Sequence, residues 1–174
     1  MSGRRRLEVE VHDETEGEAL DLARWQEVAE STLALELGDD DAADGRLDLI
    51  FVDPDTMAEL NREHMGADHA TDVLAFPLDA ADDDLDLVFP AGEPGGGDGG
   101  PMRHLGDVVV CPRVARAQAG EHCGPEDAEL TPLVVHGVLH VLGHDHAEDD
   151  ERLVMQGRER LHLGRYGFAH PVPA

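Results

Sequence analysis

The pattern of apolar and polar positions predicts four strands. Leu7 to Val11 alternates apolar with charged residues, as in a strand with one exposed face. The apolar run Val108 to Val110 is continuous, which indicates a strand buried on both faces. With their flanking residues, the four predicted strands cover 7–11, 47–52, 71–76 and 105–111.

Apolar residues at helical spacing predict about five helices. The first helix keeps its apolar residues near one face and ends before Gly38. Asp55 suits the N-cap of a short helix that follows the second strand. Pro132 lies inside a later helical pattern, so that helix either kinks there or restarts with Thr131 as its cap. The predicted helices cover 20–37, a short segment after 55, 112–119, 125–142 and 148–161.

Helices and strands interleave along the chain. This order predicts an α+β fold, with one mixed sheet of about four strands covered by about five helices. A length of 174 residues suits a single domain over residues 1–174. Residues 79–104 are acidic, then rich in glycine, and they lack periodicity, so we expect a flexible loop in this segment.

The charge balance is unusual. Thirteen basic residues, all of them arginine, face 39 acidic residues, for a formal net charge of -26. A field this negative repels phosphate backbones, so composition alone argues against a general nucleic-acid binder and against anionic membranes. Cys111 and Cys123 do not form a disulfide framework, and no apolar stretch suits a secretory signal or a membrane span. We therefore expect a cytoplasmic protein.

Three histidines within residues 136–146 have the spacing of metal ligands. His136 and His140 are four residues apart, so on a helix their imidazoles project from one face, one turn apart. His146 can join them only if the chain reverses, and Gly143 lies where a left-handed residue would end the helix. Three neutral imidazoles with an open fourth position are typical of catalytic zinc. The spacing predicts one Zn²⁺ per chain, held by His136, His140 and His146.

Other residues near this segment carry weaker signals. His144 points away from the predicted site in a turn, so it stays outside the ligand set. Asp145 either orients a ligand imidazole or caps the helix that follows. We expect the remaining histidines to be solvated: His12, His64, His69, His104, His122, His162 and His170.

The histidine and glycine spacing is also that of the metzincin metalloproteases. In those enzymes the residue after the first histidine is a glutamate that serves as general base. This chain has Gly137 at that position. Loss of a general base typically costs about 10²–10⁴-fold in rate, so the substitution argues against a peptidase.

With Gly137 in place, residues 136–146 resemble the signature of the YbeY family of zinc-dependent, single-strand-specific bacterial endoribonucleases. The family pattern is close to His-Gly-x-Leu-His-Leu-x-Gly-Tyr-Asp-His, and this chain has His144 where the tyrosine usually stands. The blocks at 60–77 and 105–112 also resemble the family. So does the final helix, with Glu151, Met155 and Glu159.

The resemblance implies a hydrolase that cuts phosphodiester bonds in single-stranded RNA, with the three histidines acting through the metal. It implies a role in maturing the 3′ end of small-subunit ribosomal RNA and in ribosome quality control. Contacts with a small-subunit ribosomal protein and an assembly GTPase are implied as well, and none with DNA. Two alternatives stay open: a metzincin-like metallopeptidase or other zinc hydrolase, and a non-catalytic ribosome-assembly factor with structural zinc.

One residue departs from the family pattern. Many members carry an arginine, thought to help catalysis, shortly after the Leu-Asn pair that aligns with residues 60–61. Met65 stands at that position, and its neutral thioether cannot hold a phosphate. Arg62, Arg113 and Arg116 are therefore candidates for substrate binding, each of which could instead be a solvated helix charge.

Overall fold

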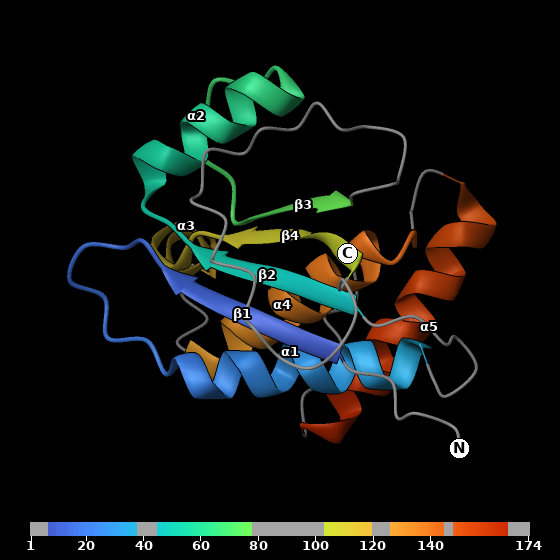
Figure 1. Cartoon of the computed structure of the whole chain (residues 1–174). Coiled ribbons are helices and arrows are strands. Elements are labelled where there is room, and N and C mark those ends of the chain that lie inside the picture. Colours follow the sequence, from blue (N-terminus) through green and yellow to red (C-terminus); the bar gives the residue numbers. More distant parts are fainter. Residues whose placement is uncertain (1–6, 38–44, 78–102, 120–125, 145–147, 167–174) are drawn as a thin grey trace.

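The computed structural model describes residues 7–37, 45–77, 103–119, 126–144 and 148–166 (Figure 1). The strands are β1 (Leu7–Asp13), β2 (Gly45–Phe51), β3 (Val73–Pro77) and β4 (Arg103–Val110). The helices are α1 (Leu22–Leu37), α2 (Pro54–Met65), α3 (Pro112–Ala119), α4 (Glu126–Val141) and α5 (Asp149–Arg165). Within the described residues, the predicted α+β fold, with a four-stranded mixed sheet and five helices, is confirmed.

The strands lie in the order β1-β2-β4-β3. β1, β2 and β4 run parallel, and β3 pairs antiparallel with β4 at one edge of the sheet. Parallel neighbours need a crossover, which α1 supplies between β1 and β2. In the paired register Val9 lies beside Leu47, and Leu49 lies beside Val108.

Alternation along the strands sends side chains to two different cores. On one face Leu47, Leu49 and Val108 pack with residues of α1, α4 and α5, whereas on the other Ile50 and Val109 pack with residues of α2. Figure 1 shows α1 and α4 on one side of the sheet and α2 on the other. β4 is therefore buried on both faces along its apolar run, as its sequence predicts.

At three positions the structure corrects the sequence expectation or decides between its alternatives. The N-cap of α2 is Asp53 rather than Asp55, because Pro54 has the fixed φ that suits the first helical position. α4 continues through Pro132 without a restart at Thr131. β4 begins at Arg103, inside the segment expected to be a loop, and the remainder of that segment lies outside the described residues.

In the described part of the chain, no helix has the length and apolar character needed to cross a membrane.

Candidate metal centre

The two helical histidines of the predicted zinc site lie together. Nε2 of His136 is 3.0 Å from Nε2 of His140. The rings meet at 74°, with their centroids 4.5 Å apart. Both side chains come from α4, one turn apart, so helical geometry alone brings these nitrogens to one point.

The chain reverses after α4 at the glycine that the sequence singles out. Gly143 has a φ of 96°, in the left-handed region. Its N–H donates to the carbonyl of His140, and the next N–H, that of His144, donates to the carbonyl of Leu139. These two bonds form a Schellman motif, which ends a helix and turns the chain back. His146 and Asp145 lie outside the described residues, so their contributions to the site stay predictions.

A buried carboxylate from α5 touches the first histidine. Glu159, only 9% exposed, contacts Nδ1 of His136 through Oε1. A carboxylate on Nδ1 holds a proton on that nitrogen and leaves the lone pair of Nε2 directed toward His140. This arrangement prepares His136 to act as a ligand through Nε2.

From the sequence alone, Glu159 has no role beyond its place in the family resemblance. The helical spacing nevertheless contains a signal that Glu159 has such a role. Glu159 shares the buried face of α5 with Met155 and Leu163, and a glutamate on an apolar face needs a partner. The identity of that partner depends on how α5 packs against α4, which spacing does not predict.

A cleft of about 270 Å³ opens beside the histidine pair. It is lined by Met65, Val73, Leu74, Ala75, His136, Gly137 and His140. Met65, at the C-terminal end of α2, is 58% exposed and faces this space. The position at which many family members carry an arginine therefore borders the cleft, where this chain presents a neutral thioether.

The three candidate arginines do not line the cleft as the described residues form it. Arg113 Nε donates to Glu18 Oε1 at 3.1 Å, and Arg116 contacts the other oxygen of the same carboxylate. Both α3 arginines are thus held by the β1–α1 connection. Arg62 is exposed on α2.

Two histidines expected to be solvated are buried or paired. His162 is 1% exposed, and its Nε2 lies 2.6 Å from Glu36 Oε1, which also accepts from Arg158 Nε at 2.8 Å. Burial raises the pKa of Glu36, but the bonds to His162 and Arg158 outweigh it and hold the pKa below its ordinary value. The expectation is wrong for His162 because α5 packs this residue against α1. His104 lies between two carboxylates of the sheet.

His144 also contacts the Glu36 carboxylate of α1, with its Nε2 3.3 Å from Glu36 Oε2. Its ring is therefore engaged with α1.

Sequence comparison then places the chain among known proteins. The family model described as endoribonuclease YbeY matches residues 10–167. The chain belongs to this family. Endoribonuclease YbeY of Stutzerimonas stutzeri is 39% identical over 155 residues, which cover 89% of this chain and 81% of the relative. Endoribonuclease YbeY of Rhizobium meliloti is 42% identical over 125 residues, covering 72% and 66%.

The fold agrees with this membership. The solution structure of TM1509 from Thermotoga maritima superposes with a TM-score of 0.51 at 22% identity, and covers 95% of this chain and 99% of that one. YbeY relatives are named endoribonucleases, which are hydrolases that act on RNA phosphodiester bonds.

Proposed function

We propose that this YbeY-family chain is a metal-dependent endoribonuclease that cleaves single-stranded RNA at the cleft beside His136 and His140. The observation that carries the proposal is the 3.0 Å approach of the two Nε2 atoms at the wall of that cleft. The relatives are named endoribonucleases, and this activity, RNA cleavage, supplies the reaction class.

The separation of the His136 and His140 nitrogens suits a shared zinc ion, and we expect His146 to be the third ligand. Two imidazole nitrogens that bind one tetrahedral Zn²⁺ at 2.0–2.1 Å lie about 3.3 Å apart, close to the separation of the His136 and His140 nitrogens. When bound, zinc supplies a Lewis acid for a phosphoryl oxygen and a lowered pKa for a water molecule.

The protein's own residues then position the reactants. Glu159 holds the ring of His136 by its Nδ1, which keeps Nε2 directed at the site. Met65, Val73 and Ala75 offer an apolar wall along one side of the cleft. An unpaired nucleotide can lay its base on such a surface, whereas a base inside a duplex has both faces stacked.

The cellular role is proposed from the resemblance. The substrate would be ribosomal RNA in the cytoplasm, with cleavage that matures the 3′ end of the small-subunit RNA and supports ribosome quality control. A small-subunit ribosomal protein and an assembly GTPase would be partners.

The test is cleavage of one unstructured RNA oligonucleotide by protein stripped with a chelator and reloaded with zinc. We expect His136→Ala and His140→Ala to lose bound zinc and cleavage together. His69→Ala removes an exposed imidazole outside the cleft and should retain both. Stoichiometric zinc in His140→Ala would refute the metal site, and equal cleavage by wild type and His136→Ala would identify a contaminating nuclease.

A further inference from the structure

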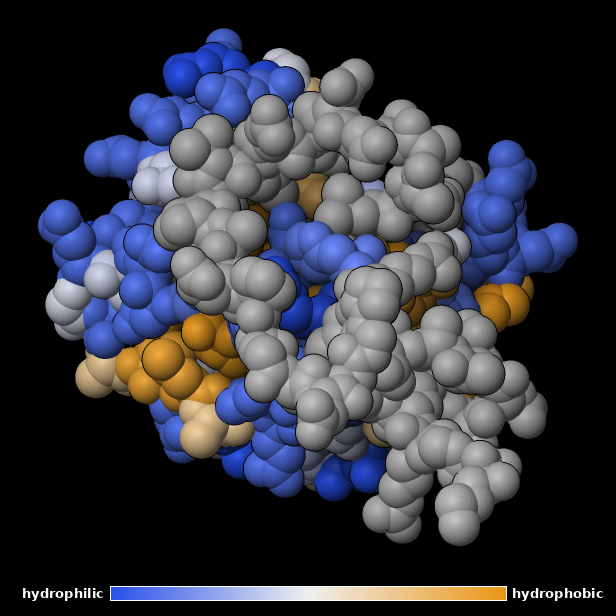
Figure 2. Space-filling model, in the orientation of Figure 1, coloured by the Kyte–Doolittle hydropathy of each residue, from blue (hydrophilic) through white to orange (hydrophobic). Residues whose placement is uncertain are grey.

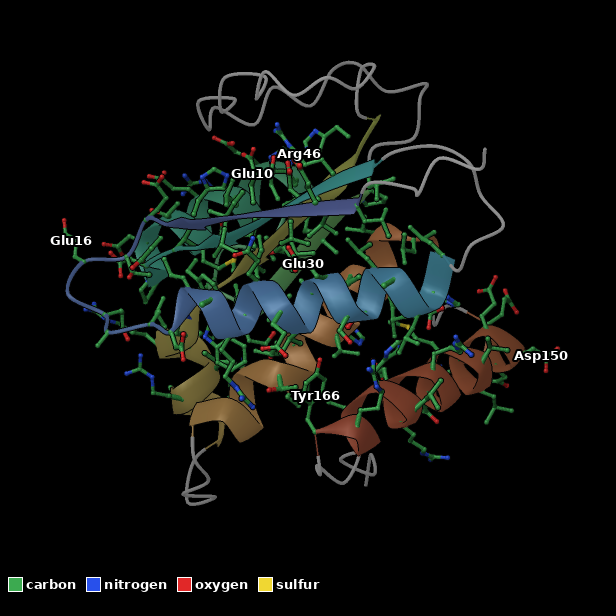
Figure 3. All side chains as sticks on the ribbon, turned by 60° about the horizontal axis from the view of Figure 1, so that its bottom comes forward. Glu10, Glu16, Glu30, Arg46, Asp150 and Tyr166 are labelled. Atoms are coloured by element: carbon green, nitrogen blue, oxygen red, sulfur yellow. The ribbon has the colours of Figure 1, made fainter. Side chains whose placement is uncertain are left out.

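A polar cluster lies on the sheet face away from α1. It contains Glu10 and His12 of β1, Arg46 and Asp48 of β2, and His104 and Asp107 of β4. Figure 3 shows Glu10 and Arg46 on the side of the sheet opposite α1. In Figure 2 hydrophilic residues occupy the middle of the visible face, in front of the strands of Figure 1.

A bulge in β4 builds this cluster. Arg46 pairs with His104, but the next residue of β2, Leu47, pairs with Gly106, so Leu105 is an extra residue in the ladder. In a regular strand His104 and Asp107, three residues apart, would point to opposite faces. The extra residue brings both side chains to one face, where they meet Asp48.

Two carboxylates converge on one ring nitrogen. His104 Nε2 is 2.9 Å from Asp107 Oδ1 and 3.1 Å from Asp48 Oδ2. A ring nitrogen carries at most one proton, so it cannot donate a full hydrogen bond to each carboxylate.

A buried oxygen in the cluster lacks a hydrogen bond. Asp48 is 8% exposed, and its Oδ1 accepts no hydrogen bond from any described residue. His12 Nε2 lies 3.8 Å from Oδ1, which is beyond hydrogen-bond distance. Arg46 Nη2 donates to the other oxygen, Oδ2. A buried acceptor without a donor costs free energy, and a cation that contacts Oδ1 of Asp48 would remove that cost.

We propose that Asp48, His104 and Asp107 form a binding site for a divalent transition-metal cation, distinct from the histidine pair of α4. Each residue offers one ligand atom, and the three atoms lie within 4.8 Å of one another. Two carboxylates and one imidazole suit a cation of the Mn²⁺ type, because hard oxygen donors predominate. The His104 side chain is 35% exposed, which gives the ion a path from solvent.

The two sites lie on opposite sides of the sheet. Val108 points toward α4, where it lies against Gly137. Its neighbour Asp107 therefore points to the other face. Loss of one metal should leave the other bound, so this proposal and the proposed function fail independently.

Manganese binding to the full chain, first loaded with zinc, tests the proposal. Electron paramagnetic resonance counts bound Mn²⁺. We expect one Mn²⁺ per chain in wild type and in the control Asp149→Asn, whose carboxylate is 95% exposed. We expect His104→Ala and Asp107→Asn to lose that ion, while His136→Ala, titrated without zinc, retains it. Equal Mn²⁺ in folded His104→Ala and wild type would overturn the proposal.

A second measurement needs no variant. Bound Mn²⁺ broadens the nuclear magnetic resonance signals of nearby protons, so the His104 ring signals of the zinc-loaded wild type should disappear at substoichiometric Mn²⁺. The ring signals of His69, which is exposed and outside the cluster, should survive at that concentration. If the ring signals of both histidines broaden together, Mn²⁺ binds the acidic surface nonspecifically, which would overturn the proposal.

Discussion

Gly137 of α4 lies directly against the side chain of Val108 on β4. A Cβ at position 137 would overlap the isopropyl group of this fully buried valine. The helix reaches the sheet this closely because residue 137 has no side chain. The glutamate that metzincins carry at this position therefore has no room here, and packing gives a physical reason for the departure from the protease pattern.

Gly137→Ala should destabilise the protein by about 1–3 kcal/mol, the usual cost of overpacking a core. Gly157→Ala is the matched control, because Gly157 lies on α5 with no atom within 4 Å of its added Cβ. That change should stabilise the helix by up to about 1 kcal/mol. Urea denaturation of both variants measures the difference, and the Val108→Ala background should relieve part of the Gly137→Ala cost. Equal effects of the two alanines would contradict the close packing.

Glu159→Gln should weaken zinc binding by about 10–100-fold, the usual effect of losing a carboxylate that orients a metal-ligating histidine. The amide keeps the volume of the carboxylate but lacks its negative charge, so it favours the proton on Nδ1 of His136 less strongly. Competition with a chromogenic chelator measures the affinity. Glu63→Gln, an exposed glutamate of α2, serves as the control. A purely structural role would lower the stability of Glu159→Gln and leave its zinc affinity unchanged.

Met65→Arg should raise RNA cleavage or RNA affinity. Met65 borders the cleft beside His136 and His140, so an arginine at this position could donate two hydrogen bonds to a phosphate. Rates and affinities of wild type and variant on one unstructured RNA give the answer. Met65→Gln, which is polar but uncharged, should produce a smaller gain. Unchanged values for Met65→Arg would mean that bound phosphate lies elsewhere.

Glu36→Gln should cost about 1–3 kcal/mol at neutral pH, because Glu36 accepts bonds from buried His162 and from Arg158. The pKa of Glu36 is lowered in the folded protein, so its contribution is complete above its ordinary value of 4.5. As the pH falls through the folded-state pKa, that contribution is lost. Unfolding free energies of wild type and Glu36→Gln should therefore converge below pH 4.5. Glu27→Gln, exposed on the same helix, should match wild type throughout.

RNA cleavage should rise with added salt before it falls. A net charge of -26 repels RNA at low ionic strength. At 1 M salt the Debye length is about 3 Å, so distant carboxylates stop acting while groups in contact with the RNA still do. Initial rates from low to molar potassium chloride, with folding checked by circular dichroism, measure the effect. A steady decline from the lowest salt would show that the acidic residues lie too far from the site to matter.

Local sequence patterns were sufficient to predict most of the fold and part of the candidate metal centre. Alternation predicted the four strands of the mixed sheet, and helical spacing predicted the five helices that pack around it, because apolar faces must be buried together. The approach of His136 to His140 follows from one helical turn. The reversal at Gly143 follows from the freedom of glycine to adopt a left-handed conformation. These features depend on residues within a few positions of one another.

Only the tertiary structure decided which distant side chains meet. The contact of Glu159 with His136 depends on how α5 packs against α4, and the burial of His162 depends on its packing against Glu36 of α1. The cluster of Asp48, His104 and Asp107 depends on the bulge at Leu105, which reverses the face that strict alternation assigns to His104. A period of two residues predicts faces only while the ladder is regular, and pairing between strands determines where that regularity breaks.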